Sequence, residues 1–179
     1  MADAFDLLTL DPSFDLDKTE VQRAYLSAAA LIHPDLAAGD DEAGRKMAAL
    51  NGAARLLESP ELRADLLVRR LGGPSADQER TLPSAFLAEM MSVREEIEAS
   101  LSDADFGARA ESRRTWEAWT AERRREAIAE VSRMFASLPS EAGDRLVALR
   151  AIRIRLNQWR YIERLIEQLD PGFNVKAGP

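Results

Sequence analysis

The 179-residue sequence contains no cysteine and only one histidine, His33. The absence of cysteine excludes disulfide bonds, thiol catalysis, thiolate zinc sites and cysteine-ligated iron-sulfur clusters. A single histidine also excludes a metal site built from several histidines. We therefore expect this chain to bind no metal and no cofactor of its own.

Aromatic residues and long apolar runs are scarce as well. Aromatics make up only 6% of the chain, and alanine, leucine, arginine and glutamate dominate, a composition that favours helices over strands. No apolar run approaches the roughly 18 residues of a membrane span, and the first residues carry acids where a signal peptide needs positive charge. We expect an all-α, cytoplasmic protein with no membrane partner.

The net charge is −7, from 31 acidic and 24 basic residues, which argues against a general affinity for nucleic acid. The acidity is concentrated in residues 1–58, which hold eleven acidic and five basic side chains. Most arginines of the second half alternate with acids at helical spacing, as on an ion-paired surface. Arg153, Arg155 and Arg160 have fewer acidic neighbours in sequence, so RNA binding by a cluster of these three remains an alternative.

Helix signals divide the first part of the chain. Asp17 is an expected N-cap, with Glu20 placed for a capping box, and Pro34 ends the helix that runs from about Lys18 to Ile32. A third helix carries apolar residues at helical spacing from Met47 to Leu57. Because only a short polar loop separates these two helices, they should lie antiparallel.

A connecting helix should begin after Ser59-Pro60 and end near Leu71. Residues 74–83, which follow two glycines, have the composition of a linker. We therefore expect a first domain over residues 1–73, a linker over 74–83 and a second domain over 84–179. The second domain should be a bundle of three helices, whose middle helix could be continuous or broken before Pro139.

The most specific local feature is the tripeptide His33-Pro34-Asp35 between the two antiparallel helices. Alone, it could be a simple helix stop followed by a turn. Placed after a short helix and a longer one, and before a returning helix, it resembles a J domain, the module by which co-chaperones stimulate the ATPase of heat-shock chaperones. A catalytic role for His33 with Asp35 would need a nucleophile or second titrating partner that the sequence lacks, so we do not expect an enzyme.

The resemblance extends beyond this tripeptide. The segments AFDLLTLDPSFDLD, IHPDL, LNGAARLLESPELRADLLV, AFLAEMMSVREEIE and LNQWRYIERLIEQLD resemble the HscB family of iron-sulfur cluster co-chaperones. The resemblance implies an N-terminal J domain, which consists of an antiparallel helix pair with a short flanking helix. It further implies that the C-terminal domain is a three-helix bundle. It also implies two partners: a heat-shock chaperone of the HscA/DnaK type and an IscU-type scaffold protein.

The resemblance assigns residues to both partners. For the chaperone, Asp35 would present a carboxylate to an arginine by charge-assisted hydrogen bonding, with His33 and Pro34 beside it. Because the second helix is uncharged from Ala24 to Ile32, the basic contacts expected of a J domain fall to Lys18, Arg23, Arg45 and Lys46.

For the scaffold, the resemblance assigns Leu87, Ala88, Met91 and Glu95 on the helix after Ser84. It adds Tyr161 on the last helix, for which packing inside the bundle is nearly as good an account. We expect a monomer or a weak dimer. The alternatives are a J-domain protein that serves a different client and a non-catalytic helical adaptor.

Overall fold

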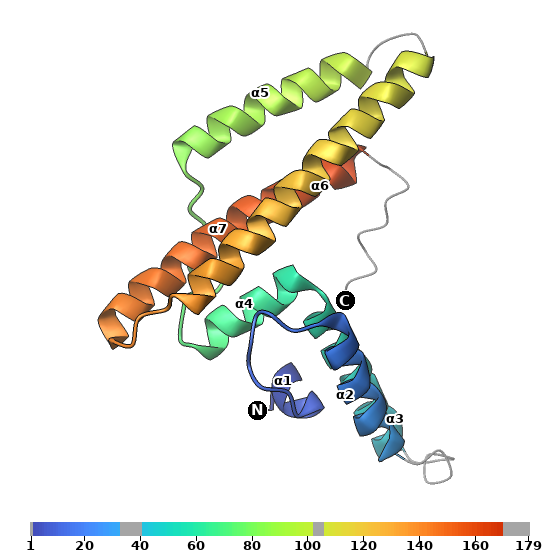
Figure 1. Ribbon diagram of the computed structural model, residues 1–179, viewed down its shortest axis with the longest axis vertical. Helices are drawn as coiled ribbons and strands as arrows, with labels where there is room; N and C mark the ends of the chain where they lie inside the picture. Colours follow the sequence, from blue (N-terminus) through green and yellow to red (C-terminus); the bar gives the residue numbers. More distant parts are fainter. Residues whose placement is uncertain (1, 33–40, 102–105, 170–179) are drawn as a thin grey trace. The chain divides into compact units, whose positions relative to one another are not determined.

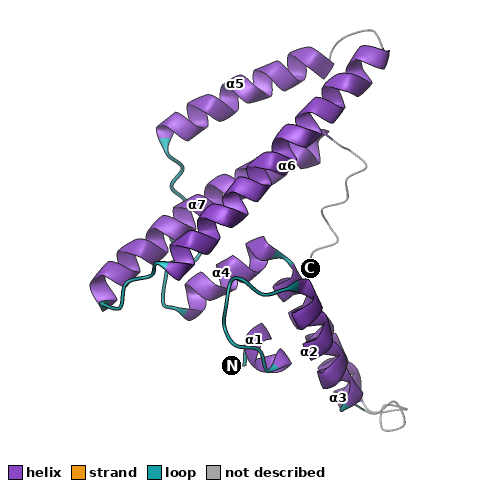
Figure 2. Ribbon diagram, in the orientation of Figure 1, coloured by secondary structure: helices purple, strands orange, loops and turns teal. Residues whose placement is uncertain are grey.

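The computed structural model describes residues 2–32, 41–101 and 106–169. All regular structure in these residues is α-helical, as Figure 2 shows, which confirms the all-α prediction. The helices are α1 (Ala4–Leu8), α2 (Lys18–Ala30), α3 (Asp41–Glu58), α4 (Pro60–Arg70), α5 (Ser84–Leu101), α6 (Phe106–Ala136) and α7 (Ala142–Leu169). None of them is both long and apolar enough to cross a membrane.

The described chain forms two compact units, which divide between Leu67 and Val68, inside α4. In the first unit α2 and α3 lie side by side and antiparallel, and the short α1 contacts both of them (Figure 1). This is the expected arrangement of an antiparallel pair with a short flanking helix. Its core consists of Phe5, Leu8, Phe14, Val21, Leu50, Leu57 and neighbouring alanines.

Local capping explains where the first helices begin. Asp3 caps α1, accepting hydrogen bonds from the backbone N–H of Phe5 and Asp6, and the Asp6 carboxylate accepts from the Asp3 N–H in return. Asp17 caps α2 by accepting from the Thr19 N–H at 2.9 Å, which confirms the predicted N-cap, but among the described residues the Glu20 carboxylate makes no return bond to the Asp17 N–H. The usual sequence pattern does not predict the capping box at Asp3, because the second carboxylate belongs to an aspartate rather than to glutamate or glutamine.

In the second unit α6 and α7 run side by side, and α5 lies against both of them (Figure 1). The three-helix bundle is therefore confirmed, and α6 is one continuous helix rather than two. The bundle core is built from Met90 of α5, Ala127 and Val131 of α6, and a longer series from α7: Leu149, Ile152, Leu156, Trp159, Ile162 and Leu165.

Residues 74–83, expected as a linker, lie within the second unit and are bonded to α7. Arg150 Nε donates to Glu79 Oε2 at 2.5 Å, and Arg153 Nε donates to the carbonyl oxygen of Pro74 at 3.3 Å. Asn157 Nδ2 donates to the carbonyl oxygens of Glu79 and Thr81. The segment is therefore held along one side of α7 at three successive turns of the helix.

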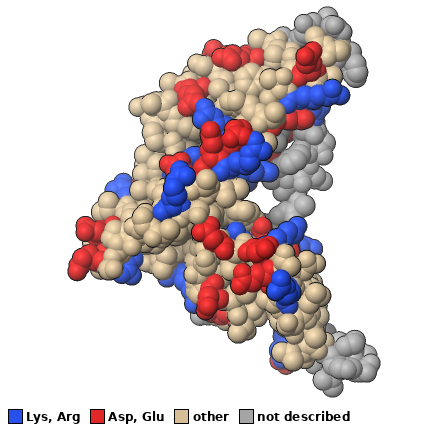
Figure 3. Space-filling view, in the orientation of Figure 1, with Lys and Arg blue, Asp and Glu red and all other residues tan. Residues whose placement is uncertain are grey.

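The arginine-rich helices form ion pairs, as their alternation with acids predicts. Arg123 pairs with Glu89 at 2.6 Å and with Glu126 at 3.3 Å, and Arg125 pairs with Glu122. On the face drawn in Figure 3, basic and acidic side chains lie beside one another. This surface has the mixed sign expected of a solvated, ion-paired face.

Arg153, Arg155 and Arg160 do not form an exposed basic cluster. Their partners are more than one helical turn away in sequence or not acidic, so the local pattern of charges does not reveal them. Arg153 is buried, Arg155 pairs with Glu130 at 2.6 Å, and Arg160 lies 4.0 Å from Glu167. The feature that motivated the RNA-binding alternative is therefore absent from this part of the structure.

Candidate functional site

The helix α5 has one buried face and one exposed face, and the division between them is sharp. Met90 is buried against Ile162 and Leu165 of α7, and the half-buried Phe86 and Val93 pack around this cluster. These residues repeat every three or four positions, the spacing of one helix face. They hold α5 against the bundle and so fix the direction in which its exposed face points.

The exposed face carries the four residues of α5 assigned to the scaffold. Leu87, Ala88, Met91 and Glu95 are all exposed, with 37% of Leu87 and 62% of Met91 accessible. Because Leu87, Met91 and Glu95 are spaced by four, they follow one another along a single stripe. We call these four residues the α5 stripe: an apolar surface that ends in a carboxylate.

The acids near the α5 stripe differ in their partners. Glu89 is engaged by Arg123, whose guanidinium also lies over the Trp119 ring at 5.2 Å, and Glu98 is engaged by Arg94 at 2.8 Å. The latter pair raises the pKa of Arg94. Among the described residues Glu95 has no ion pair, so its carboxylate stays available to a basic group on another molecule.

Tyr161 is half-buried and does not belong to the α5 stripe. Its ring meets the Phe86 ring edge-to-face, with centroids 5.8 Å apart and an interplanar angle of 82°. Packing against Phe86 therefore explains why the Tyr161 side chain is half-buried. Only its partly exposed remainder is available to a partner.

The residues assigned to the chaperone are placed in part. Lys18 and Arg23 are exposed on α2, and Arg45 and Lys46 are exposed on α3, where Lys46 pairs with Glu42 at 2.7 Å. His33, Pro34 and Asp35 lie outside the described residues. The four basic residues thus lie on the two helices that the tripeptide joins in sequence.

Sequence reasoning overlooked one exposed apolar feature of the first unit. Leu31 is 87% exposed and Leu26 is 59% exposed, although both lie in or just after α2. The sequence signal is the uncharged run from Ala24 to Ile32, which makes the end of this helix apolar as well as poor in basic residues.

Comparison with known proteins agrees with this two-part architecture. The family model of the DnaJ domain matches residues 3–66, and that of the HSCB C-terminal oligomerisation domain matches residues 82–170. The chain is 30% identical over 175 residues to the co-chaperone protein HscB homolog of Bordetella pertussis, covering 93% of this chain and 94% of the relative. It is 28% identical over 173 residues to that of Bordetella petrii, with the same coverage.

Solved structures share the fold. A human co-chaperone HscB crystal structure superposes with a TM-score of 0.70, covering 94% of this chain and 81% of the other. Chaperone HscB from Vibrio cholerae gives a TM-score of 0.63, covering 94% and 100%. Both are 22% identical in sequence to this chain.

A J domain joined to a helical C-terminal domain defines a co-chaperone of the J-domain class. Within that class, the chain belongs to the HscB family.

Proposed function

We propose that this protein is a co-chaperone of iron-sulfur cluster biogenesis that binds an IscU-type scaffold and stimulates the ATPase of an HscA/DnaK-type chaperone. The bundle would hold the scaffold on the α5 stripe while the J domain engages the ATP-bound chaperone. ATP hydrolysis would then lock the scaffold onto the chaperone. The chain itself is not an enzyme in this scheme, and the cluster is cargo carried by the scaffold.

The observation that carries the proposal is the exposed pair Leu87 and Met91. Met90, one position away, already supplies the core contact, so the bundle does not need these two side chains for its own packing. Exposed apolar residues grouped on one face are a common mark of a protein interface. Methionine suits such a surface because its flexible side chain adapts to a partner.

Glu95 supports the same reading. A carboxylate without an ion pair at the end of an apolar stripe can bond a lysine or arginine of the partner and fix the direction in which it docks. Family resemblance and this chemistry together support the assignment of the α5 stripe to the scaffold.

The test combines the purified chain with an HscA-type chaperone and an IscU-type scaffold from the same genome. We expect ATP turnover to rise above that of chaperone plus scaffold, and Asp35→Asn to abolish the rise. Among single charge removals in the J domain, Arg23→Ala should weaken stimulation most. No rise in turnover, with Asp35→Asn indistinguishable from the unmodified protein, would refute the proposal.

A second candidate is a J-domain protein that recruits a different client to a general chaperone. It is distinguished by direct binding of the scaffold. If the chain stimulates the chaperone but does not bind the scaffold in calorimetry, and Leu87→Ala and Met91→Ala have no effect, the different-client function is the correct one.

A further inference from the structure

A groove of about 640 Å³ opens between α1, α2 and α3 in the first unit. Leu7 contributes from α1, Leu31 and Ile32 from the residues just after α2, and Lys46 from α3. Four more lining residues have small side chains: Ala24, Ser27, Ala28 and Ala49. The groove is thus mainly apolar, with the hydroxyl groups of Thr9 and Ser27 and the cationic side chain of Lys46 among its lining.

The groove exists because α2 extends beyond α1, the short helix that covers it. Val21 is fully buried, and Ala24 and Ala28 continue the same face three and seven positions later. The covering helix α1 is only five residues long. Since alanine and serine cannot fill the space beyond α1, the apolar face of α2 remains open to solvent.

Two leucines border this open face. Leu31 is 87% exposed and Leu7 is 38% exposed. An apolar groove of this size with exposed leucines at its border is the kind of surface that a partner covers.

Charge indicates which kind of contact this surface can make. After Arg23 the helix has no charged residue up to Ile32, and residues 1–58 carry a net charge of −6. An acidic partner surface would be repelled by this unit as a whole and would find few cations on α2. The contact that α2 can offer beyond Arg23 is apolar.

The position of the groove indicates the partner. Leu31 and Ile32 immediately precede His33 in the sequence, and the proposed function assigns His33 and the two residues after it to the chaperone. A chaperone that engages this tripeptide therefore lies next to the end of the groove. The groove continues the proposed chaperone-binding surface rather than forming a separate one.

We propose that the groove between α1, α2 and α3 binds an apolar segment of the heat-shock chaperone and carries most of the docking that cations provide in more basic J domains. This inference rests on the proposed function and specifies the chemistry of its chaperone contact. The segment would place aliphatic side chains among the small residues of the groove, between Leu7 and Leu31.

The test compares Leu31→Ser and Leu7→Ser with Leu26→Ser. Leu26 is a matched control because it is 59% exposed on α2 but does not line the groove. In titrations of ATPase stimulation, we expect each groove variant to raise the half-saturating concentration about tenfold. The Leu26 variant should change this half-saturating concentration by less than about twofold. Raising the NaCl concentration should increase the half-saturating concentration of the unmodified protein by less than about threefold.

The outcomes separate the two proposals. If the unmodified protein stimulates no chaperone, the proposed function fails. If it stimulates normally and the groove variants match Leu26→Ser, the groove proposal is wrong and the chaperone contact lies elsewhere. The groove proposal is also wrong if these variants reduce self-association or scaffold binding while ATPase stimulation is unchanged. Should Leu7→Ser lower the melting temperature, Leu31→Ser still decides, because that side chain is almost fully exposed.

Discussion

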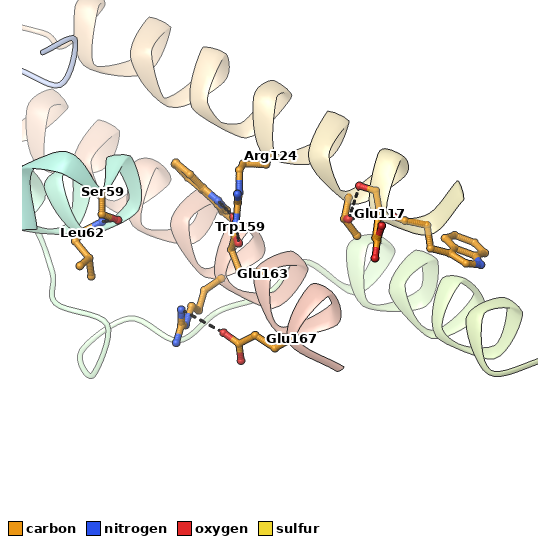
Figure 4. Close-up of polar contacts among 10 residues, drawn as sticks. Ser59, Leu62, Glu117, Arg124, Trp159, Glu163 and Glu167 are labelled. Carbon is orange, nitrogen blue, oxygen red and sulfur yellow. Dashed lines mark hydrogen bonds and ion pairs between the residues drawn. The ribbon is translucent and has the colours of Figure 1, made fainter. Parts of the chain in front are cut away.

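Arg124 of α6 and Glu163 of α7 form a two-point ion pair, in which the Nε and Nη2 atoms of the arginine donate to the two carboxylate oxygens of the glutamate. Trp159, fully buried in α7, donates its Nε1–H to the same carboxylate at 2.8 Å. Figure 4 shows Arg124 and Trp159 converging on Glu163. Since the Glu163 side chain is only 8% exposed, this junction satisfies a buried charge and fastens the two long helices together.

Removing this carboxylate should destabilise the bundle. Glu163→Ala leaves the buried Trp159 N–H without its acceptor and removes the ion pair that joins α6 to α7 at Arg124, so we expect the free energy of unfolding to fall by about 3 kcal/mol. Glu163→Gln, which keeps an acceptor for Trp159, should cost less. Urea unfolding followed by tryptophan fluorescence measures this directly, because all three tryptophans belong to the second unit.

The control for this prediction is Glu122→Ala. Glu122 pairs with Arg125 on the exposed side of α6, where loss of an ion pair should change stability by less than about 0.5 kcal/mol. Equal unfolding midpoints for the Glu163 and Glu122 variants would show that the buried junction does not hold the helices together.

Acid should weaken the attachment of residues 74–83 to α7. Hydrogen bonds from the Thr81 hydroxyl and N–H and from Arg150 hold the pKa of Glu79 at about 2, below the usual value for glutamate. A lowered pKa in the folded state means that the stabilisation is complete above pH 4.5 and is lost as the pH falls toward 2. We therefore expect Glu79→Gln to be less stable than the unmodified protein at neutral pH, with the difference shrinking over that interval.

Asp77→Asn is the control for the acid prediction. Asp77 lies in the same segment, but its side chain is 90% exposed and contacts only the exposed Arg80 among the bonds described. Because this ion pair is exposed, its loss should change the free energy of unfolding by less than about 0.5 kcal/mol in measurements from pH 7 to pH 3. A stability difference for Glu79→Gln that is constant over this range would contradict the assigned role of Glu79.

The helices could be predicted from the sequence because their signals are local. Asp17, Pro34 and the apolar spacing of α7 define helix ends and faces from neighbouring residues alone. The sequence does not decide whether α6 is one helix or two, because it shows two apolar groups with charged residues between them. Packing against α7 and, through Trp116 and Ser100, against α5 stabilises one helix, and these contacts are not local in sequence.

The candidate site can be predicted only where the sequence itself separates the buried face of a helix from its exposed face. The exposed α5 stripe follows from the spacing of Leu87 and Met91 against that of Phe86 and Met90. The role of residues 74–83 did not follow, because Glu79 meets Arg150 and Asn157 more than 70 positions away. The groove was hidden for a similar reason: whether Ala24 and Ala28 are covered depends on where α1 ends.

Gly73 should tolerate no side chain. A Cβ atom there would lie 2.7 Å from Val68 Cγ1 and 2.8 Å from Leu149 Cβ, so α7 or the end of α4 would have to move. We expect Gly73→Ala to lower the free energy of unfolding by about 1–3 kcal/mol. Gly143→Ala, where nothing lies within 4 Å of the added atom, should be neutral or stabilising by up to about 1 kcal/mol. If both alanines had the same effect, the close approach at Gly73 would not be limiting.

Met90 and Met91 are adjacent on α5 but should respond oppositely to truncation. Met90 is 1% exposed, so Met90→Ala leaves a cavity and should cost about 2–5 kcal/mol of stability. Met91 is 62% exposed, so Met91→Ala should leave thermal stability unchanged while weakening scaffold binding about tenfold, the loss expected for a central apolar contact. Thermal unfolding and calorimetric titration with the scaffold separate the two effects. A Met91 variant that binds the scaffold normally would remove the α5 stripe from the interface.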